Sequence, residues 1–159
     1  MSDLVYILNG PNLNMLGKRE PHLYGHTTLA EIEAATRALA ARLELRCEFR
    51  QTNSEATMVD WLQEAFEADA GVVLNPAGFS FRSIPVLDAA KLLRRPLIEV
   101  HITNIHKREE IYRHSLISSV ATGVICGLGV QGYSLALHAL AGMLASAHAP
   151  ARASIPTLP

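Results

Sequence analysis

Short apolar segments alternate along this chain with segments of helical period, and this alternation restricts the possible folds more than any other feature. Strand-like apolar runs are predicted at residues 4–8, 46–51, 70–74, 97–100 and 121–125. Between and after them, apolar residues recur every three or four positions, as on one face of a helix. Chains that alternate in this way form a parallel sheet with right-handed crossovers. We therefore predict a flavodoxin-like, doubly wound α/β fold whose five strands have the order 2-1-3-4-5, with helices on both faces.

Residues that favour helix starts precede three of the helical segments. Ser, Thr and Asn cap helices because their side-chain oxygens accept hydrogen bonds from the free N–H groups of the first turn. The third of these helices is expected to reach about Leu93, since Pro96 prevents its continuation. The predicted caps are Thr27 or Thr28, Asn53 or Ser54, and Ser83.

Composition narrows the class of protein. The chain has 159 residues, of which 49% are hydrophobic and 18% charged, as expected for one globular domain over residues 1–146 with a flexible tail from about Ala147. The net charge of -1, without a basic run, argues against nucleic-acid binding. No apolar stretch reaches the ~18 residues of a membrane span, and the first residues lack a signal-peptide pattern. We expect a cytoplasmic protein without a membrane partner.

Several motifs for cofactors or metals are incomplete. Residues 127–132 fit G-x-G-x-x-G, but they follow the last predicted strand and no acidic residue follows at the required distance, so a tight turn is favoured over a dinucleotide site. His101 and His106 have no third ligand in register. Cys47 and Cys126 lie in apolar runs and are interpreted as buried free thiols. The sequence thus predicts neither a metal nor a cofactor.

The unusual polar residues follow the predicted strands, where a doubly wound sheet binds its ligands. The first of these segments, residues 10–25, is too rich in Gly, Pro and Asn to continue as strand or helix. Gly17 and Gly25 bracket its charged and aromatic part, which suggests a flap that closes over a ligand. We therefore expect a small-molecule site at this edge of the sheet.

The side chains expected there suit acid–base chemistry. Tyr24 could act as a base if guanidinium groups such as Arg19 and Arg108 favour its phenolate. His101 could donate a proton, with Glu99 on the same side of the strand fixing its tautomer. A buried structural pair is the alternative interpretation of Glu99 and His101.

Three segments resemble the type II 3-dehydroquinate dehydratase family. ILNGPNLNMLGKREPHLYG, residues 7–25, resembles the family's signature, and IEVHITNIH, residues 98–106, with Arg108 resembles its second block. The glycine-rich residues 123–133 resemble a third block. The resemblance extends over about residues 3–146 and implies a flavodoxin-like fold, a dodecamer of four trimers, and a cofactor-free anti elimination of water from 3-dehydroquinate to 3-dehydroshikimate. The pathway would be shikimate synthesis or quinate breakdown.

The resemblance also implies roles for individual residues. Tyr24 would remove a proton from the carbon beside the ketone, and the enolate would be stabilised through a water held by Asn12. His101, oriented by Glu99, would then protonate the departing hydroxyl. The other implied roles are ionisation of Tyr24 by Arg19 and Arg108, binding of the carboxylate and nearby oxygens by Asn75 and the backbone of Ile102 and Thr103, and a contact of Asp88 with the next subunit's site.

Two positions depart from the family's pattern. Phe81 stands where a histidine contacts the ring hydroxyls, and Tyr112 where an arginine contacts the same region. We expect an intact elimination site with an altered hydroxyl pocket, and Arg113 is the candidate to replace the missing cation. Two alternatives stay open at this point: a relative that dehydrates a modified dehydroquinate analogue, and a binding relative without turnover.

Overall fold

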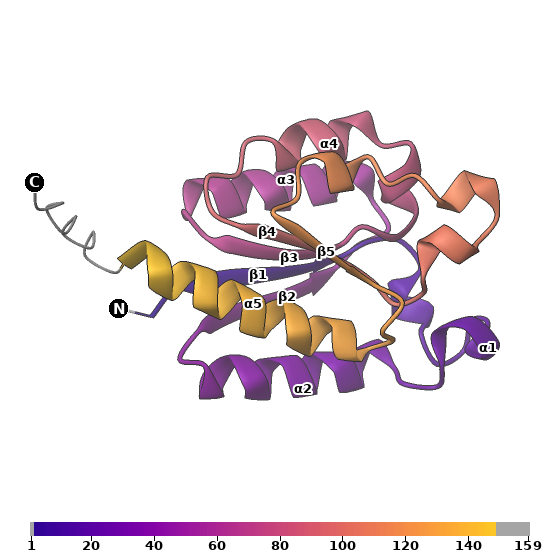
Figure 1. The fold of residues 1–159 in the computed structure, drawn as a ribbon, viewed down its shortest axis with the longest axis horizontal. Helices are drawn as coiled ribbons and strands as arrows, with labels where there is room; N and C mark the ends of the chain where they lie inside the picture. Colours follow the sequence, from indigo (N-terminus) through magenta and orange to yellow (C-terminus); the bar gives the residue numbers. More distant parts are fainter. Residues whose placement is uncertain (1, 149–159) are drawn as a thin grey trace, which may run out of the picture.

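A parallel five-stranded sheet forms the centre of the molecule, as predicted. The computed structural model describes residues 2–148, and its strands have the order β2-β1-β3-β4-β5 (Figure 1). The second strand lies at an edge of the sheet, as the predicted order requires. The strands are β1 Leu4–Asn9, β2 Arg46–Gln51, β3 Gly71–Asn75, β4 Leu97–His101 and β5 Gly123–Cys126.

Helices cover both faces of the sheet and bury a separate apolar core on each side (Figure 1). The core under α2 and α5 contains Ile7 and Leu137, and the core under α3 and α4 contains Leu8 and Leu62. Successive residues of β1 therefore point into opposite cores, which is why this strand is apolar throughout. The helices are α1 Pro21–Tyr24, α2 Leu29–Arg42, α3 Glu55–Glu67, α4 Ile84–Ala90 and α5 Gln131–His148.

The predicted caps start three of these helices. Thr28, rather than Thr27, begins α2 and forms a reciprocal capping box with Glu31. Ser54 accepts from the N–H of the third residue of α3, and Ser83 does the same for α4. Each bond satisfies one of the donors that a helix start leaves free.

Some boundaries differ from the prediction. Helix α4 ends at Ala90 instead of near Leu93, because the following N–H groups turn back onto carbonyls three residues earlier and tighten the last turn. The first loop was expected to contain no helix, yet it holds α1 and the 3-10 turn Leu13–Met15. Pro21 explains α1, since its fixed φ suits a first helical position.

The last helix runs further than predicted. The tail was expected from about Ala147, but α5 continues to His148, and the rest of that expected tail lies outside the described residues. Within residues 2–148, no helix has the length and hydropathy of a membrane span.

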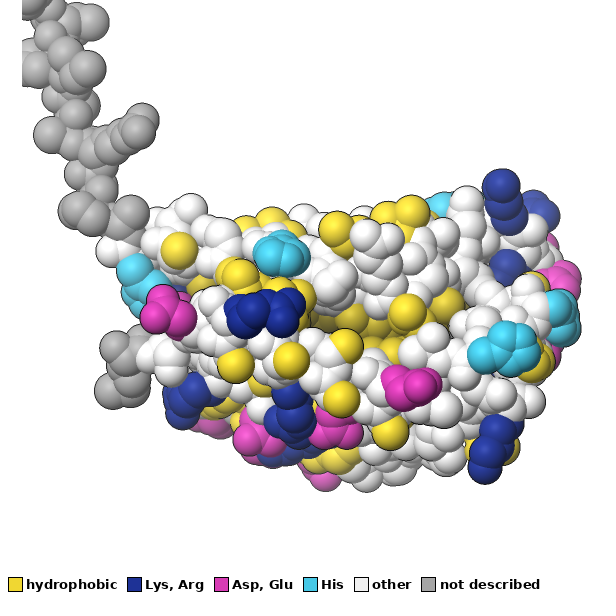
Figure 2. All heavy atoms as spheres, turned by 90° about the horizontal axis from the view of Figure 1, so that it is seen from below, with side chains coloured by type: hydrophobic (Ala, Val, Ile, Leu, Met, Phe, Trp, Pro, Cys, Tyr) yellow, Lys and Arg dark blue, Asp and Glu magenta, His cyan; other side chains and the backbone are white. Residues whose placement is uncertain are grey.

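Figure 2 views the face formed by α2 and α5, where apolar side chains such as Ile32, Leu39 and Val130 line a hollow.

Candidate active site

A pocket opens where the carboxyl ends of the strands meet the first loop. These strand ends and the loop with α1 lie at the right of Figure 1. It encloses about 580 Å³ including its opening to solvent, a size suited to a small metabolite. Every predicted site residue lines it except Glu99, which lies behind His101, and Asp88. The lining residues are Pro11, Asn12, Leu13, Arg19, Tyr24, Asn75, Ala77, Gly78, Phe81, His101, Ile102, Thr103, Ile105, Arg108 and Tyr112.

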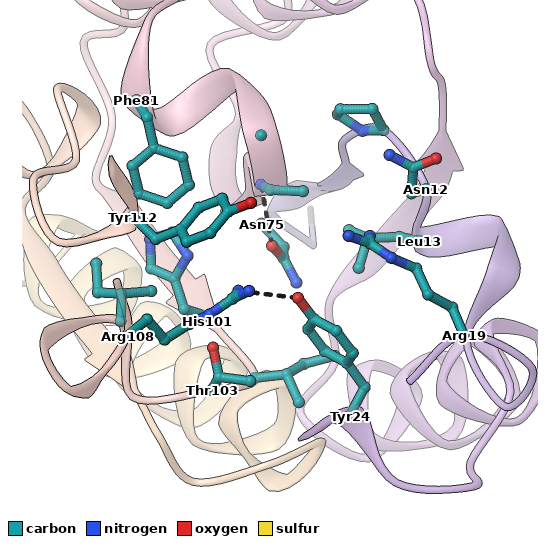
Figure 3. Close-up of a pocket in the computed structure, with 15 residues that line it drawn as sticks. Asn12, Leu13, Arg19, Tyr24, Asn75, Phe81, His101, Thr103, Arg108 and Tyr112 are labelled. Atoms are coloured by element: carbon teal, nitrogen blue, oxygen red, sulfur yellow. Dashed lines mark hydrogen bonds between the residues drawn. The ribbon is translucent and has the colours of Figure 1, made fainter. Parts of the chain in front are cut away.

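Tyr24 lies between two guanidinium groups. Arg108 Nη1 donates a hydrogen bond of 2.9 Å to the Tyr24 hydroxyl oxygen, shown dashed in Figure 3. The Cζ atoms of Arg19 and Arg108 lie 5.4 and 5.8 Å from the centroid of the Tyr24 ring. Tyr24 ends α1, so the short helix in the first loop sets the direction of this side chain.

His101 and Glu99 form a buried pair at the end of β4. His101 Nε2 lies 2.6 Å from Glu99 Oε1, and the two side chains are 5% and 0% exposed. Ser115 also donates to Glu99 Oε1, and Ser118 donates to Oε2 at 2.6 Å. Burial alone would raise the pKa of the Glu99 carboxyl, but the bonds from His101, Ser115 and Ser118 outweigh it and hold this pKa below its ordinary value. The pair is therefore a carboxylate that accepts from the imidazole, with the remaining ring nitrogen left for a ligand.

The lowered pKa of Glu99 predicts a pH-dependent stability. A carboxyl whose pKa is depressed on folding stabilises the protein fully above its unfolded pKa, about 4.5 here, and loses this contribution as pH falls through the folded value. We expect the difference in unfolding free energy between wild type and Glu99→Gln, from urea titrations, to shrink as pH falls below about 4.5. Glu67→Gln, at the exposed end of α3, is the control. A difference independent of pH would contradict the expectation.

Asn75 belongs to a buried chain of hydrogen bonds under the pocket. Its Nδ2 donates to the Tyr133 hydroxyl at 2.8 Å, and that hydroxyl donates to Asn9 Oδ1 at 2.7 Å. Asn75 Oδ1 accepts from the N–H of Ala77 at 3.3 Å. Because both ends of the amide are bonded, its orientation is set before a ligand arrives, and one N–H of Nδ2 stays available. Burial raises the pKa of Tyr133, so this hydroxyl stays a neutral donor.

The loops after β1 and β3 approach each other closely at the base of the pocket. Gly10 N donates to Asn75 O at 2.8 Å, and a Cβ at Gly10 would come within 2.4 Å of Pro76 O. Only glycine fits this approach. Asn12 has a left-handed φ of 67°, which asparagine tolerates well, and its N–H donates to Asn53 Oδ1 at 2.9 Å. This geometry leaves the Asn12 side chain at the pocket, as Figure 3 shows.

The two positions that depart from the family's pattern form one wall of the pocket. The Phe81 ring meets the Tyr112 ring edge-on, with centroids 5.5 Å apart, and lies roughly parallel to the His101 ring at 6.4 Å. Arg113 does not replace the missing cation. Its Nη1 pairs with Glu110 at 3.3 Å and its Nε donates to the Arg108 carbonyl, so it lies outside the pocket.

Asp88 also lies away from this pocket. It is on α4, 64% exposed, and pairs with Lys91 at 3.2 Å. Any contact of Asp88 with an active site would therefore be with that of another subunit.

Sequence reasoning missed several residues that support the site. Ser115 and Ser118 follow a polar stretch that carries no motif, and only the fold brings them to Glu99. Asn9 and Tyr133 lie 124 positions apart, so their bond leaves no local signal in the sequence. The glycine-rich turn before α5 was interpreted correctly: Gly127 has a φ of +84°, and a Cβ there would meet Asn104 at 2.8 Å.

No group of three or more His, Cys, Asp or Glu side chains suited to hold a metal occurs among the described residues. Cys47 and Cys126 are free and partly buried, and burial raises the pKa of the Cys47 thiol. The groups assembled at the pocket are two phenols, an imidazole with its carboxylate, two guanidiniums and two carboxamides.

The fold and the site together define a flavodoxin-like α/β protein whose pocket carries acid–base groups at the carboxyl edge of its sheet. The model of the family "Dehydroquinase class II" matches residues 3–141. The chain belongs to this family.

Individual relatives agree with this assignment. A 3-dehydroquinate dehydratase of Salinispora tropica is 56% identical over 137 residues, covering 86% of this chain and 96% of the relative. One of Brucella canis is 51% identical over 143 residues, covering 90% and 91%. The crystal structure of a type II dehydroquinase from Propionibacterium acnes superposes with a TM-score of 0.87 at 46% identity, covering 89% of this chain and 98% of that one.

Proposed function

We propose that this chain is a hydro-lyase that eliminates water from 3-dehydroquinate through an enolate to give 3-dehydroshikimate. The observation that carries the proposal is the pairing, in one pocket, of a phenol bonded to Arg108 with an imidazole bonded to a buried carboxylate. A β-elimination next to a ketone needs a base and an acid that act at different atoms. The chain's similarity to relatives named 3-dehydroquinate dehydratase supports the same substrate.

In the first step, the Tyr24 phenolate removes a proton from the carbon beside the ketone. The electron pair of that C–H bond moves to the ketone oxygen and forms the enolate. Arg108 and Arg19 favour the phenolate before the step. Asn12, at the base of the first loop, is the residue that would hold a water against the enolate oxygen.

In the second step, the imidazolium of His101 gives its proton to the departing hydroxyl, which leaves as water while the enolate collapses to the enone. Glu99 stabilises the imidazolium through the 2.6 Å bond to Nε2. Asn75, Ile102 and Thr103 line the pocket, where they would hold the carboxylate and neighbouring oxygens. Tyr24 ends the cycle protonated and His101 neutral, and proton exchange with solvent restores both.

The proposal includes an assembly of four trimers. The exposed Asp88 on α4 would reach the active site of the next subunit, which ties activity to the trimer. Cytoplasmic location is a further part of the proposal, and the free thiols of Cys47 and Cys126 suit a reducing compartment. The enzyme would serve shikimate synthesis or quinate breakdown.

Turnover of 3-dehydroquinate tests the proposal directly. On mixing purified protein with 3-dehydroquinate, we expect the absorbance of the conjugated enone to rise with multiple turnovers per site and without added metal or cofactor. Failure to form enone from 3-dehydroquinate would overturn the proposal. The modified-analogue hypothesis predicts that failure together with turnover of an analogue, and none of the relatives reported above favours it.

A further inference from the structure

The side chain of Tyr112 lies directly against the guanidinium of Arg108. The Arg108 Cζ is 4.2 Å from the centroid of the Tyr112 ring, well within the range in which an aromatic face attracts a cation. The Arg108 side chain is 17% exposed, and partial desolvation strengthens such a contact. Arg108 is thus held from two sides, by the Tyr112 ring and by its bond to the Tyr24 hydroxyl.

Phe81 supports the ring of Tyr112 from behind. The edge-on arrangement of the two rings, with an angle of 74° between their planes, is a favourable one for aromatic pairs. Phe81 also covers the ring of His101. The Tyr112 ring is therefore restrained by Phe81, which itself packs against His101.

The geometry points to Tyr112 as a positioning residue: its ring, supported by Phe81, holds the Arg108 guanidinium against the Tyr24 hydroxyl so that the base stays ionised. The inference rests on the proposed function, in which Tyr24 is that base. The Tyr112 hydroxyl points into the pocket in Figure 3, where it can contact a polar group of the substrate. The ring and the hydroxyl therefore have separable roles.

The other charged groups around Tyr24 do not supply this positioning. Glu109 lies 3.9 Å from Arg108 Nε but is 77% exposed, and such ion pairs are weak in water. Arg19, the second cation near Tyr24, pairs with the exposed Glu20 at 3.4 Å. The aromatic face of Tyr112 is thus the strongest described contact that restrains the Arg108 guanidinium on the side away from Tyr24.

Two substitutions separate the roles of the ring and the hydroxyl. Tyr112→Phe keeps the ring, so we expect the pH profile of kcat to stay at the wild-type position while KM rises about 3- to 10-fold from the lost hydroxyl contact. Tyr112→Leu removes the ring as well. We expect the acidic limb of its kcat profile, where activity rises as the base becomes ionised, to move to higher pH by about half to one unit. At pH values on this limb, kcat should therefore fall about 3- to 10-fold.

A matched control exists on the far side of the fold. Arg94 Cζ lies 4.3 Å from the ring centroid of Phe66, nearly the same geometry as Arg108 and Tyr112 but outside the pocket. Phe66→Leu removes a cation–aromatic contact of the same kind and should leave the pH profile of kcat unchanged. A shift in Phe66→Leu equal to that of Tyr112→Leu would show a general loss of stability and overturn the inference.

A titration without turnover decides the inference independently of the proposed function. Of the chain's four tyrosines, both Tyr112 variants keep the same three, Tyr6, Tyr24 and Tyr133, so a difference between their tyrosinate absorbance titrations reports on Tyr24. Each titration is repeated with Tyr24→Phe combined with the Tyr112 variant. Subtracting this second curve from the first leaves the absorbance that comes from Tyr24. We expect phenolate to form at higher pH in Tyr112→Leu than in Tyr112→Phe. Coincident titrations would overturn the inference, whereas absent turnover in the wild type would overturn only the proposed function.

Discussion

Tyr24→Phe is expected to lower kcat for 3-dehydroquinate by a factor of about 10² to 10⁴, the usual contribution of a positioned acid or base. The substitution keeps the ring that Arg19 and Arg108 approach, so the flap retains its packing. It removes only the oxygen that takes the proton and accepts from Arg108. The rise of enone absorbance measures the effect, and thermal unfolding checks that the variant is folded.

Tyr6→Phe is the matched control for this experiment. The Tyr6 hydroxyl is hydrogen-bonded too, donating at 2.8 Å to Glu64, but Tyr6 belongs to the core under α3 and α4. We expect the kcat of Tyr6→Phe to stay within a factor of about two of wild type, because this hydrogen bond is remote from the pocket. If Tyr24→Phe lost no more activity than Tyr6→Phe, Tyr24 would not be the base.

His101→Ala should lower kcat about as much as Tyr24→Phe, but it should block a different step. Without the imidazolium the hydroxyl leaves slowly, yet Tyr24 can still form the enolate and return its proton. In deuterated water we therefore expect His101→Ala to exchange the hydrogen beside the ketone faster than it forms enone. Tyr24→Phe should lose both the exchange and the elimination.

His106→Ala provides the control for the histidine substitution. His106 is exposed in the 3-10 turn Ile105–Lys107 and does not line the pocket. Its activity should match wild type. If His101→Ala formed enone as fast as it exchanged hydrogen, the assignment of His101 as the acid of the second step would be wrong.

Phe81 packs on the ring of His101 and Tyr112 packs on the guanidinium of Arg108, and the Tyr24–Arg108 and His101–Glu99 contacts stay in place. The expected substitute for the missing cation, Arg113, instead braces the backbone of Arg108. The wall formed by Phe81 and Tyr112 therefore touches two residues of the proposed active site, Arg108 and His101. It brings no charged side chain of its own into the pocket.

Much of the fold was predictable because its determinants are local. The alternation of apolar and helical periods predicts a parallel sheet with helices on its faces, and the order 2-1-3-4-5 was chosen as a common one for five such strands. Thr28, Ser54 and Ser83 mark helix starts through bonds within their own first turns. The ends of elements were less predictable. Helix α4 ends at Ala90 because the next turn tightens into bonds three residues back, and the spacing of apolar residues does not show where such a tightening begins.

The sequence by itself indicated the edge of the sheet at which the pocket opens and most of the functional side chains that line it, because in a parallel sheet every strand's carboxyl end reaches the same edge. Only the tertiary structure decided which of those residues touch. Ser115 and Ser118 bond to Glu99, Tyr133 bonds to Asn75, and the ring of Tyr112 lies against Arg108. These contacts depend on how separate loops pack on the sheet, and side chains from different loops meet through distances and angles that no local pattern encodes.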